Sequence, residues 1–395
     1  MNGFEEMKSE VANERPLDGI LVLDFTSIVA GPYCTRLLSD LGAKVIKVES
    51  ADGDNYRVRP PMRGKYSNMF GHLNAGKDCI VLDLKSQAGI EAALELASKV
   101  DVVVENWRPG VAKRLGLGYE SISKINEGVV FCSISGFGQE GPSAHRSAYA
   151  PIVHAASGFD MALIEGKSPS EAPAVTSIFI ADMLAGISAF GAIQTALFRR
   201  ERTGNGQFID VALMDCIMSI MVHECQTVQA SSGIRERVFR PLRTRDGFIV
   251  VAPNTQKNFK QMTVATNQPE LLEDLRFSTS KARGSNWSSL MDIVEVWTKS
   301  RLTSECEEIL LTAGVPCSRY KSIAEAMEDP QVKARGVLTT VKDGSGEFKV
   351  FNPPFHMRGL NTVVRSHVSE LGEDTSQVLT DLLGYSAERV AKAKG

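Results

Sequence analysis

Asp182 is the residue best placed for chemistry, because it is the only ionisable side chain in the apolar run Ile178–Leu197. Apolar residues spaced mostly three and four apart follow it, which predicts a helix that ends in the basic segment 199–202 before Gly204. A carboxylate at or just before a helix N-terminus is stabilised by backbone N–H groups and the helix dipole. Two interpretations stay open: a structural N-cap, or a carboxylate placed in an apolar cleft for catalysis.

Other common catalytic patterns are absent from the sequence. There is no HxxxH pair, no G-x-S-x-G elbow and no Walker lysine loop. His154 and His223 lie on apolar stretches, where core histidines are more common than catalysts. His145 and Arg146 follow a Gly-Pro turn and are interpreted as a solvated loop. Seven scattered cysteines without a CxxC pair indicate reduced thiols and no zinc site.

Elimination leaves Asp182 together with loop residues at strand ends. A carboxylate can act as a covalent nucleophile toward an activated acyl group when it is well placed and partly dehydrated. Such chemistry needs no metal, no histidine and no redox cofactor. The residues are compatible with this reaction but do not by themselves identify it.

Composition bounds the class of protein. With 395 residues, the chain is long enough for two or three domains, and 43% hydrophobic residues describe a soluble globular protein. A net charge of −3 gives no support for a nucleic-acid or acidic-lipid surface. The polar start MNGFEEMKSEVANERP has no apolar signal segment, and the longest apolar run holds Asp182, Ser188 and Gln194. We therefore predict a cytoplasmic protein with no membrane span.

Strands alternate with helices over the first 135 residues or so, which predicts an α/β fold with a doubly wound, Rossmann-like sheet. The predicted strands are 20–25, 44–48, 79–84, 101–106 and 128–135. Ligands bind outside the carboxyl ends of such strands, here segments 26–31, 49–52, 106–110 and 136–141. The first turn reads TSIVAGP and lacks G-x-G-x-x-G, which disfavours a dinucleotide dehydrogenase.

The pattern of apolar and turn residues along the whole chain predicts its division into domains. We place a large Rossmann-like domain with the nucleophile at 16–205, a linker helix at 206–224 and a smaller α+β domain at 225–330. Residues 331–395 are predicted to be a return linker and a C-terminal segment that rejoins the large domain.

Taken together, the chain resembles the class III (family III) CoA-transferases, which include formyl-CoA transferase and carnitine CoA-transferase, with α-methylacyl-CoA racemase as a relative. The resemblance runs from Pro16 to about Val390. It is carried in order by PLDGILVLDFTSIVAGP, LLSDLGAKVIKVE, VVVENWRPGVAKRLGLGYESI, SISGFGQEGP, IADMLAG, RRERTGNGQFIDVAL, DPQVKARGV and LGEDTSQVLTDLLGY.

The resemblance implies that Asp182, followed by Gly186, is the nucleophile of a ping-pong CoA transfer through mixed-anhydride and aspartyl-CoA thioester intermediates. It implies coenzyme A as a substrate, with no tightly bound cofactor and no metal. It also implies an interlocked homodimer whose partners are acyl-CoA and carboxylate molecules. The positions matching the CoA-contacting residues are Val29, Ala30, Asn106, Trp107, Arg114 and Phe137.

The chain departs from the family pattern in places. Tyr149-Ala150 stands where Tyr-Asp is common, 74–77 lacks one basic residue, and no glycine-rich loop is recognisable in 225–330. Segment 148–154 resembles transferases that use C4–C5 dicarboxylates. The alternative is an acyl-CoA racemase or epimerase, but the position of its histidine matches Tyr149. A third hypothesis is a non-catalytic CoA-binding dimer.

Overall fold

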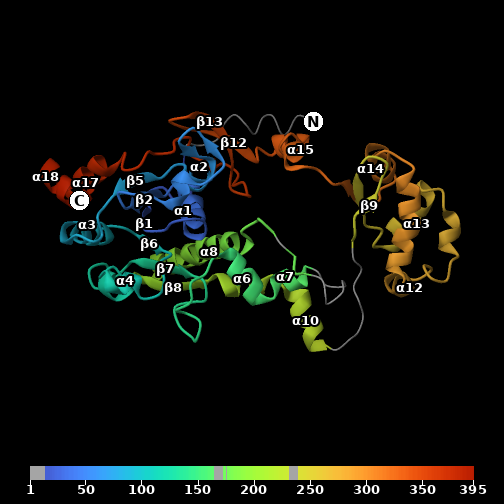
Figure 1. Ribbon diagram of the computed structural model, residues 1–395, viewed down its shortest axis with the longest axis horizontal. Helices are drawn as coiled ribbons and strands as arrows, with labels where there is room; N and C mark the ends of the chain where they lie inside the picture. Colours follow the sequence, from blue (N-terminus) through green and yellow to red (C-terminus); the bar gives the residue numbers. More distant parts are fainter. Residues whose placement is uncertain (1–13, 164–171, 175, 231–238) are drawn as a thin grey trace. The chain divides into compact units, whose positions relative to one another are not determined.

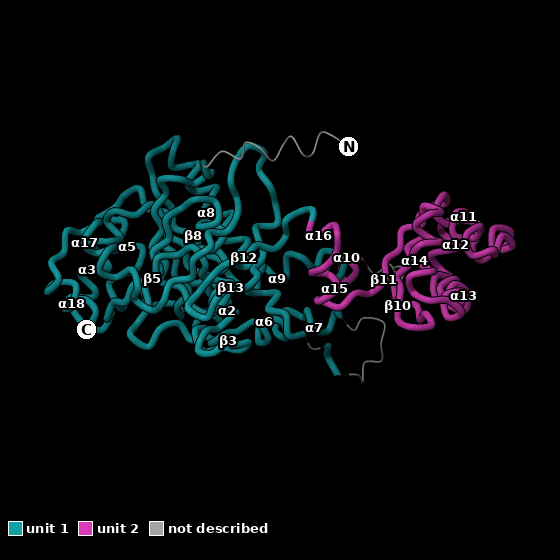
Figure 2. Tube along the Cα trace, turned by 90° about the horizontal axis from the view of Figure 1, so that it is seen from above, with its two compact units in different colours: residues 1–226, 334–395 teal, residues 227–333 magenta. Residues whose placement is uncertain are grey.

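The computed structural model describes residues 14–163, 172–174, 176–230 and 239–395. The chain divides into two compact units, coloured separately in Figure 2: unit 1 is Met1–Gln226 with Ala334–Gly395, and unit 2 is Thr227–Lys333. The first 13 residues, on which the prediction about a signal segment rests, lie outside the described part.

Unit 1 is built on a six-stranded sheet in which every pairing is parallel (Figure 1). In spatial order the strands are β5 (Asp78–Val81), β2 (Lys44–Glu49), β1 (Leu21–Asp24), β6 (Val102–Glu105), β7 (Val130–Ser135) and β8 (Gln207–Ala212). This order runs outward in both directions from the first strand, as in nucleotide-binding α/β folds. The predicted α/β class with a parallel sheet is confirmed.

Helices cover both faces of this sheet. Successive residues of a strand point to opposite faces, and here the residues on both faces are apolar and packed under helices. Val102 and Val104 face one cluster of buried residues and Val103 faces the other. The first cluster packs under α1 (Ala30–Asp40), α6 (Ala150–Ser157), α7 (Phe159–Ala162), α8 (Ile180–Thr203) and α9 (Leu213–Ser219). The second packs under α3 (Gln87–Ala97), α5 (Tyr119–Ile122), α17 (Thr375–Leu383) and α18 (Ala387–Lys394).

The remaining elements of unit 1 are short. They are η2 (Asn55–Val58), β3 (Met62–Arg63), β4 (Tyr66–Ser67), α2 (Asn68–Asn74), α4 (Val111–Arg114), β12 (Leu338–Asp343) and β13 (Gly346–Phe351). Two further helices, α10 (Val222–Ala230) and α16 (Pro330–Ala334), cross the boundaries between the units.

Two segments differ from the sequence-based expectation. The segment expected to be a linker helix at 206–224 begins with the edge strand β8, and its helical part is divided into α9 and α10. The stretch expected to be a linker after 331 contains the antiparallel hairpin β12–β13. Strand and hairpin pairing depends on partners distant in sequence, which local periodicity does not reveal.

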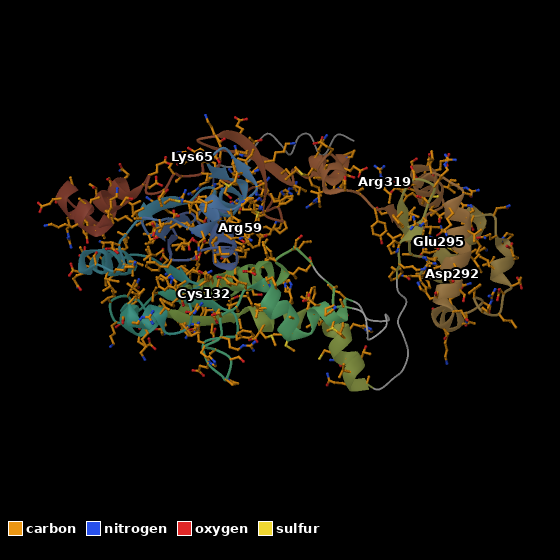
Figure 3. The ribbon with its side chains drawn as sticks, viewed as in Figure 1. Arg59, Lys65, Cys132, Asp292, Glu295 and Arg319 are labelled. Carbon is orange, nitrogen blue, oxygen red and sulfur yellow. The ribbon has the colours of Figure 1, made fainter. Side chains whose placement is uncertain are left out.

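Unit 2 combines a small antiparallel sheet, in the order β11-β10-β9, with helices. Its elements are β9 (Leu242–Arg243), β10 (Phe248–Val251), α11 (Gln256–Ala265), η3 (Pro269–Leu272), α12 (Ser280–Ser285), α13 (Trp287–Lys299), α14 (Thr303–Thr312), β11 (Cys317–Arg319) and α15 (Ile323–Met327). Asp292 and Glu295, labelled on α13 in Figure 3, lie 2.6 Å and 3.1 Å from guanidinium nitrogens of Arg240.

Candidate active site

The candidate site lies where the strand order reverses, between β1 and β6 in unit 1. At this point the loops after two neighbouring strands diverge and leave a crevice. The Asn106 side chain joins the loops: its Oδ1 accepts from the Ser27 N–H at 2.9 Å and its Nδ2 donates to the Ser27 carbonyl at 2.8 Å. Asn106 therefore has the loop-anchoring role at the position that the resemblance assigns to CoA contact.

The loop after β1 is held in an unusual conformation. Ile28 has φ of 74°, which is rare for a β-branched residue. The Ile28 N–H faces both carboxylate oxygens of Asp54 at 3.3 Å, and the Lys47 ammonium lies 3.0 Å from the same carboxylate. Lys47 also donates to the Thr26 carbonyl at 2.7 Å. These buried charges constrain the backbone just before α1 begins at Ala30.

A second buried ion pair, between Lys77 and Asp24, stabilises the segment from β1 to the first turn of α1. Lys77 lies 3.0 Å from Asp24 and also donates to Thr35, Asn74 and the Pro32 carbonyl. Burial lowers the pKa of Lys77 to about 8, while the charges of Lys77 and Lys47 help to hold the pKa of Asp24 below its usual range despite its burial. Removing either partner would leave an uncompensated charge in the core.

Three helix N-termini converge on Asp182. Asp182 is the third residue of α8, whose N-cap is Phe179, so it lies inside the first turn and not at the cap position itself. Its carboxylate accepts backbone hydrogen bonds from its own N–H and from Ala30 and Ala150, the first residues of α1 and α6. Burial raises the pKa of Asp182 to about 6, and the three N–H groups oppose that rise.

His154 holds the start of the same helix. Phe179 offers no side-chain cap, and the Ala181 N–H donates to Nε2 of His154 at 3.2 Å. His154 is 2% exposed, and burial lowers its pKa, which keeps this nitrogen unprotonated and able to accept. The interpretation of His154 as a satisfied core histidine fits this contact.

Gly186 lets α1 and α8 approach closely enough for these contacts. A Cβ at this position would lie 2.8 Å from the Ala30 carbonyl oxygen and 3.0 Å from Cδ1 of Tyr33. A glycine four residues after Asp182 is therefore needed for the approach of Ala30 to the carboxylate.

A cavity of about 170 Å³ opens onto Asp182. Its lining includes Ala30, Asn106 and Trp107 among the predicted CoA-contacting residues. The Val29 side chain is buried in another core cluster, together with residues of α2 and of the β12–β13 hairpin. Phe137 packs on the first core cluster, and the Arg146 guanidinium lies 4.8 Å from the centre of its ring. Exposed Arg114 ends α4 and lies outside this lining.

A larger cavity of about 480 Å³ shares Ser27 and Trp107 with the first. It is formed by the loops after β1, β2 and β5, and its lining combines the basic residues Lys85 and Lys394 with the carboxylates of Glu49, Asp52, Asp54 and Asp83. Trp107 packs on Phe25 with ring centroids 5.2 Å apart and thus stands between the two cavities.

Among the residues that line the smaller cavity, Ser135 and Arg146 received no ligand role from the sequence. Ser135 ends a predicted strand, which is the position that signals a ligand site in a parallel sheet. Arg146 carried no such signal and was expected in a solvated loop. In the described ranges, no group of three or more His, Cys, Asp or Glu residues is arranged to hold a metal ion.

Comparison with known proteins now adds the family. The sequence profile of CoA-transferase family III matches residues 17–375. The chain belongs to CoA-transferase family III. This assignment shows that the protein is a CoA-transferase, with coenzyme A as part of its substrate.

Individual relatives of this CoA-transferase support the assignment. Acetyl-CoA:oxalate CoA-transferase of Acetobacter aceti is 36% identical over 339 residues, covering 83% of this chain and 86% of that protein. Human succinyl-CoA:glutarate CoA-transferase is 30% identical over 397 residues, covering 98% and 90%. The crystal structure of a CAIB/BAIF family protein from Brucella suis matches with a TM-score of 0.82 at 30% identity, covering 93% of this chain and all of that one.

Proposed function

We propose that this CoA-transferase uses Asp182 as its nucleophile to move CoA from an acyl-CoA donor to a short dicarboxylate. The convergence of three helix N-termini on one half-buried carboxylate is the observation that carries this proposal. The N–H groups favour the charged carboxylate, and burial keeps it weakly solvated. A group held in this way is ionised near neutral pH and retains the reactivity of a carboxylate with a raised pKa.

The reaction proceeds without a proton donor. An Asp182 oxygen attacks the thioester carbonyl of the donor and CoA leaves as thiolate, which forms a mixed anhydride. The thiolate then attacks the Asp182 carbonyl, releases the donor carboxylate and forms an aspartyl-CoA thioester. The acceptor carboxylate displaces CoA to form a second anhydride, and the thiolate finally attacks the acceptor acyl carbon, which regenerates the Asp182 carboxylate. Each step exchanges one carbonyl bond for another.

The backbone N–H groups at Ala30 and Ala150 have a further role in this scheme. They already face the Asp182 carboxylate oxygens. When the Asp182 carbonyl is attacked, its oxygen acquires negative charge. The N–H groups of Ala30 and Ala150 point at this oxygen and can donate hydrogen bonds to it. The same pair that holds the resting carboxylate thus stabilises the tetrahedral intermediates at Asp182.

The two adjoining cavities suit an elongated ligand. The smaller one has room for an acyl group and the thioester but lies below the volume usual for a whole drug-sized ligand. We place the nucleotide part of CoA in the larger cavity, with the pantetheine arm passing Ser27 and Trp107, which line both. Lys85 and Lys394 there offer positive charge to phosphates, and two of the carboxylates in the lining, Glu49 and Asp54, are paired with Arg57 and Lys47. Contact between Arg114 and a CoA phosphate stays a prediction.

The acceptor class follows from the relatives and the cavity. Oxalate and glutarate, the acids named for two relatives, are both dicarboxylates. The cavity around Asp182 also contains two arginines, Arg108 and Arg146, which suit anionic ligands. Racemisation is not favoured, because the nearby His154 uses Nε2 to cap α8.

We further propose a homodimer in which a second copy covers α8 and its neighbours. Helix α8 has the length and apolar composition of a membrane span, a property also found in core helices of soluble proteins. Only 39% of its most apolar window is buried within this chain. Exposed apolar residues of this region are Ile187, Phe198, Met218, Ile220 and Val222. Interlocking of the subunits, the cytoplasmic location and the absence of membrane and nucleic-acid partners stay predictions.

The test is covalent trapping. The protein is incubated with acetyl-CoA or succinyl-CoA, treated with hydroxylamine or borohydride, and digested for mass spectrometry. We expect a modification at Asp182 that is absent from Asp182→Asn, which also loses transfer to a panel of carboxylates. The matched control is Asp215→Asn, because Asp215 also lies in the first turn of a helix but is exposed and outside the cavity lining. Full activity in Asp182→Asn would refute the proposal.

A further inference from the structure

Ser135 carries a hydroxyl that the protein leaves without a partner. It is the last residue of β7 and is 7% exposed, and its Oγ is itself enclosed and makes no hydrogen bond within the described part of the chain. Buried polar groups are nearly always paired, so such an atom is a candidate hydrogen-bond partner for a bound ligand or water. The same side chain lines the cavity at Asp182.

Arg146 lines the same cavity and also lacks a counter-ion. Its guanidinium stacks over the Phe137 ring at 4.8 Å, and among the described residues no carboxylate forms an ion pair with it. The Arg146 side chain is exposed, so its N–H groups are available for a carboxylate.

Gly136 brings these two groups into one wall of the cavity. A Cβ at Gly136 would lie 2.1 Å from Cβ of Ala148, so the segment that carries Arg146 packs directly on the residue after Ser135. The same segment leads into Ala150, whose N–H faces Asp182. The reacting carboxylate, the hydroxyl and the guanidinium therefore share one small space.

We propose that Ser135 and Arg146 form the subsite for the second, non-reacting carboxylate of a dicarboxylate acceptor. The first carboxylate of the acceptor attacks at Asp182, and the second pairs with the Arg146 guanidinium. It also accepts a hydrogen bond from the Ser135 hydroxyl, which rotates from its enclosed position toward the cavity when the acceptor binds. A monocarboxylate of equal length gains neither contact, so the two residues determine specificity. This inference rests on the proposed function and refines its acceptor class.

The experiment compares glutarate with pentanoate, in which a methyl group replaces the second carboxylate. Acetyl-CoA is the donor, because it has no second carboxylate of its own. For Arg146→Gln we expect the KM for glutarate to rise about tenfold while that for pentanoate changes less than roughly twofold. Arg146→Lys should retain part of the selectivity. The matched control is Arg243→Gln in unit 2, where the guanidinium also lies over a phenylalanine ring, at 4.9 Å.

Ser135→Ala separates a ligand contact from a structural one. We expect the KM for glutarate to rise about threefold without loss of thermal stability, because the hydroxyl has no protein partner to lose. A lowered melting temperature, or equal effects on both acceptors, would overturn its assignment. A selective loss in Arg108→Gln and none in Arg146→Gln would overturn the role of Arg146. Absence of transfer to every acceptor, from acetyl-CoA or succinyl-CoA, would instead refute the proposed function.

Discussion

Gly186→Ala should damage both the packing and the chemistry of the site. Ordinary contact begins at 3.4 Å, and the new Cβ would lie 2.8 Å from the Ala30 carbonyl oxygen, so α1 and α8 must separate by about 0.6 Å. The obstacle is backbone, which cannot rotate away as a side chain can. Overpacking of this kind costs about 1–3 kcal/mol.

A second glycine in the same helix provides the reference. At Gly191 an added Cβ meets nothing within 4 Å. Replacing glycine with alanine inside a helix gains about 0.8–1 kcal/mol from propensity alone, and this gain applies at both positions. The difference between Gly186→Ala and Gly191→Ala therefore isolates the packing cost, which we expect to be about 1–3 kcal/mol.

The assay has two parts. Hydrogen exchange of amides in α1 and α8 measures the free energy of local opening without assuming that both units unfold together. Steady-state kinetics measure kcat, which should fall about tenfold in Gly186→Ala, because the Ala30 N–H moves away from Asp182. The reasoning fails if Gly186→Ala is as stable and as active as Gly191→Ala.

Three further predictions concern the groups around this contact. Because burial raises the pKa of Asp182 to about 6, kcat/KM should fall roughly tenfold per pH unit below 6 as the carboxylate is protonated; a flat profile from pH 5 to 7 would contradict this. His154→Leu leaves the Ala181 N–H unpaired and should cost about 1–3 kcal/mol in the opening of α8, whereas His154→Gln retains an acceptor, so equal losses would argue against the cap. Asn106→Ala removes both bonds to Ser27 and should destabilise the protein by about 1–3 kcal/mol and raise the KM for acyl-CoA; unchanged values for both would refute the anchoring role.

The sequence alone determined the architecture of the parallel sheet in unit 1 and pointed to Asp182. Apolar runs such as Val102–Glu105 are typical of strands buried on both faces, and their alternation with helices restricts the topology strongly. The isolated charge of Asp182 can be recognised from the sequence, because the residues around it are almost all apolar.

Tertiary structure alone decided what surrounds Asp182. The N–H groups of Ala30 and Ala150 belong to helices that start far from it in sequence, and backbone donors carry no sequence signal. The positive φ of Ile28 is imposed by Asp54, a contact that local propensity opposes. The placement of Arg146 on the cavity wall depends on how Ala148 packs against Gly136, a contact between loops that no periodic pattern encodes.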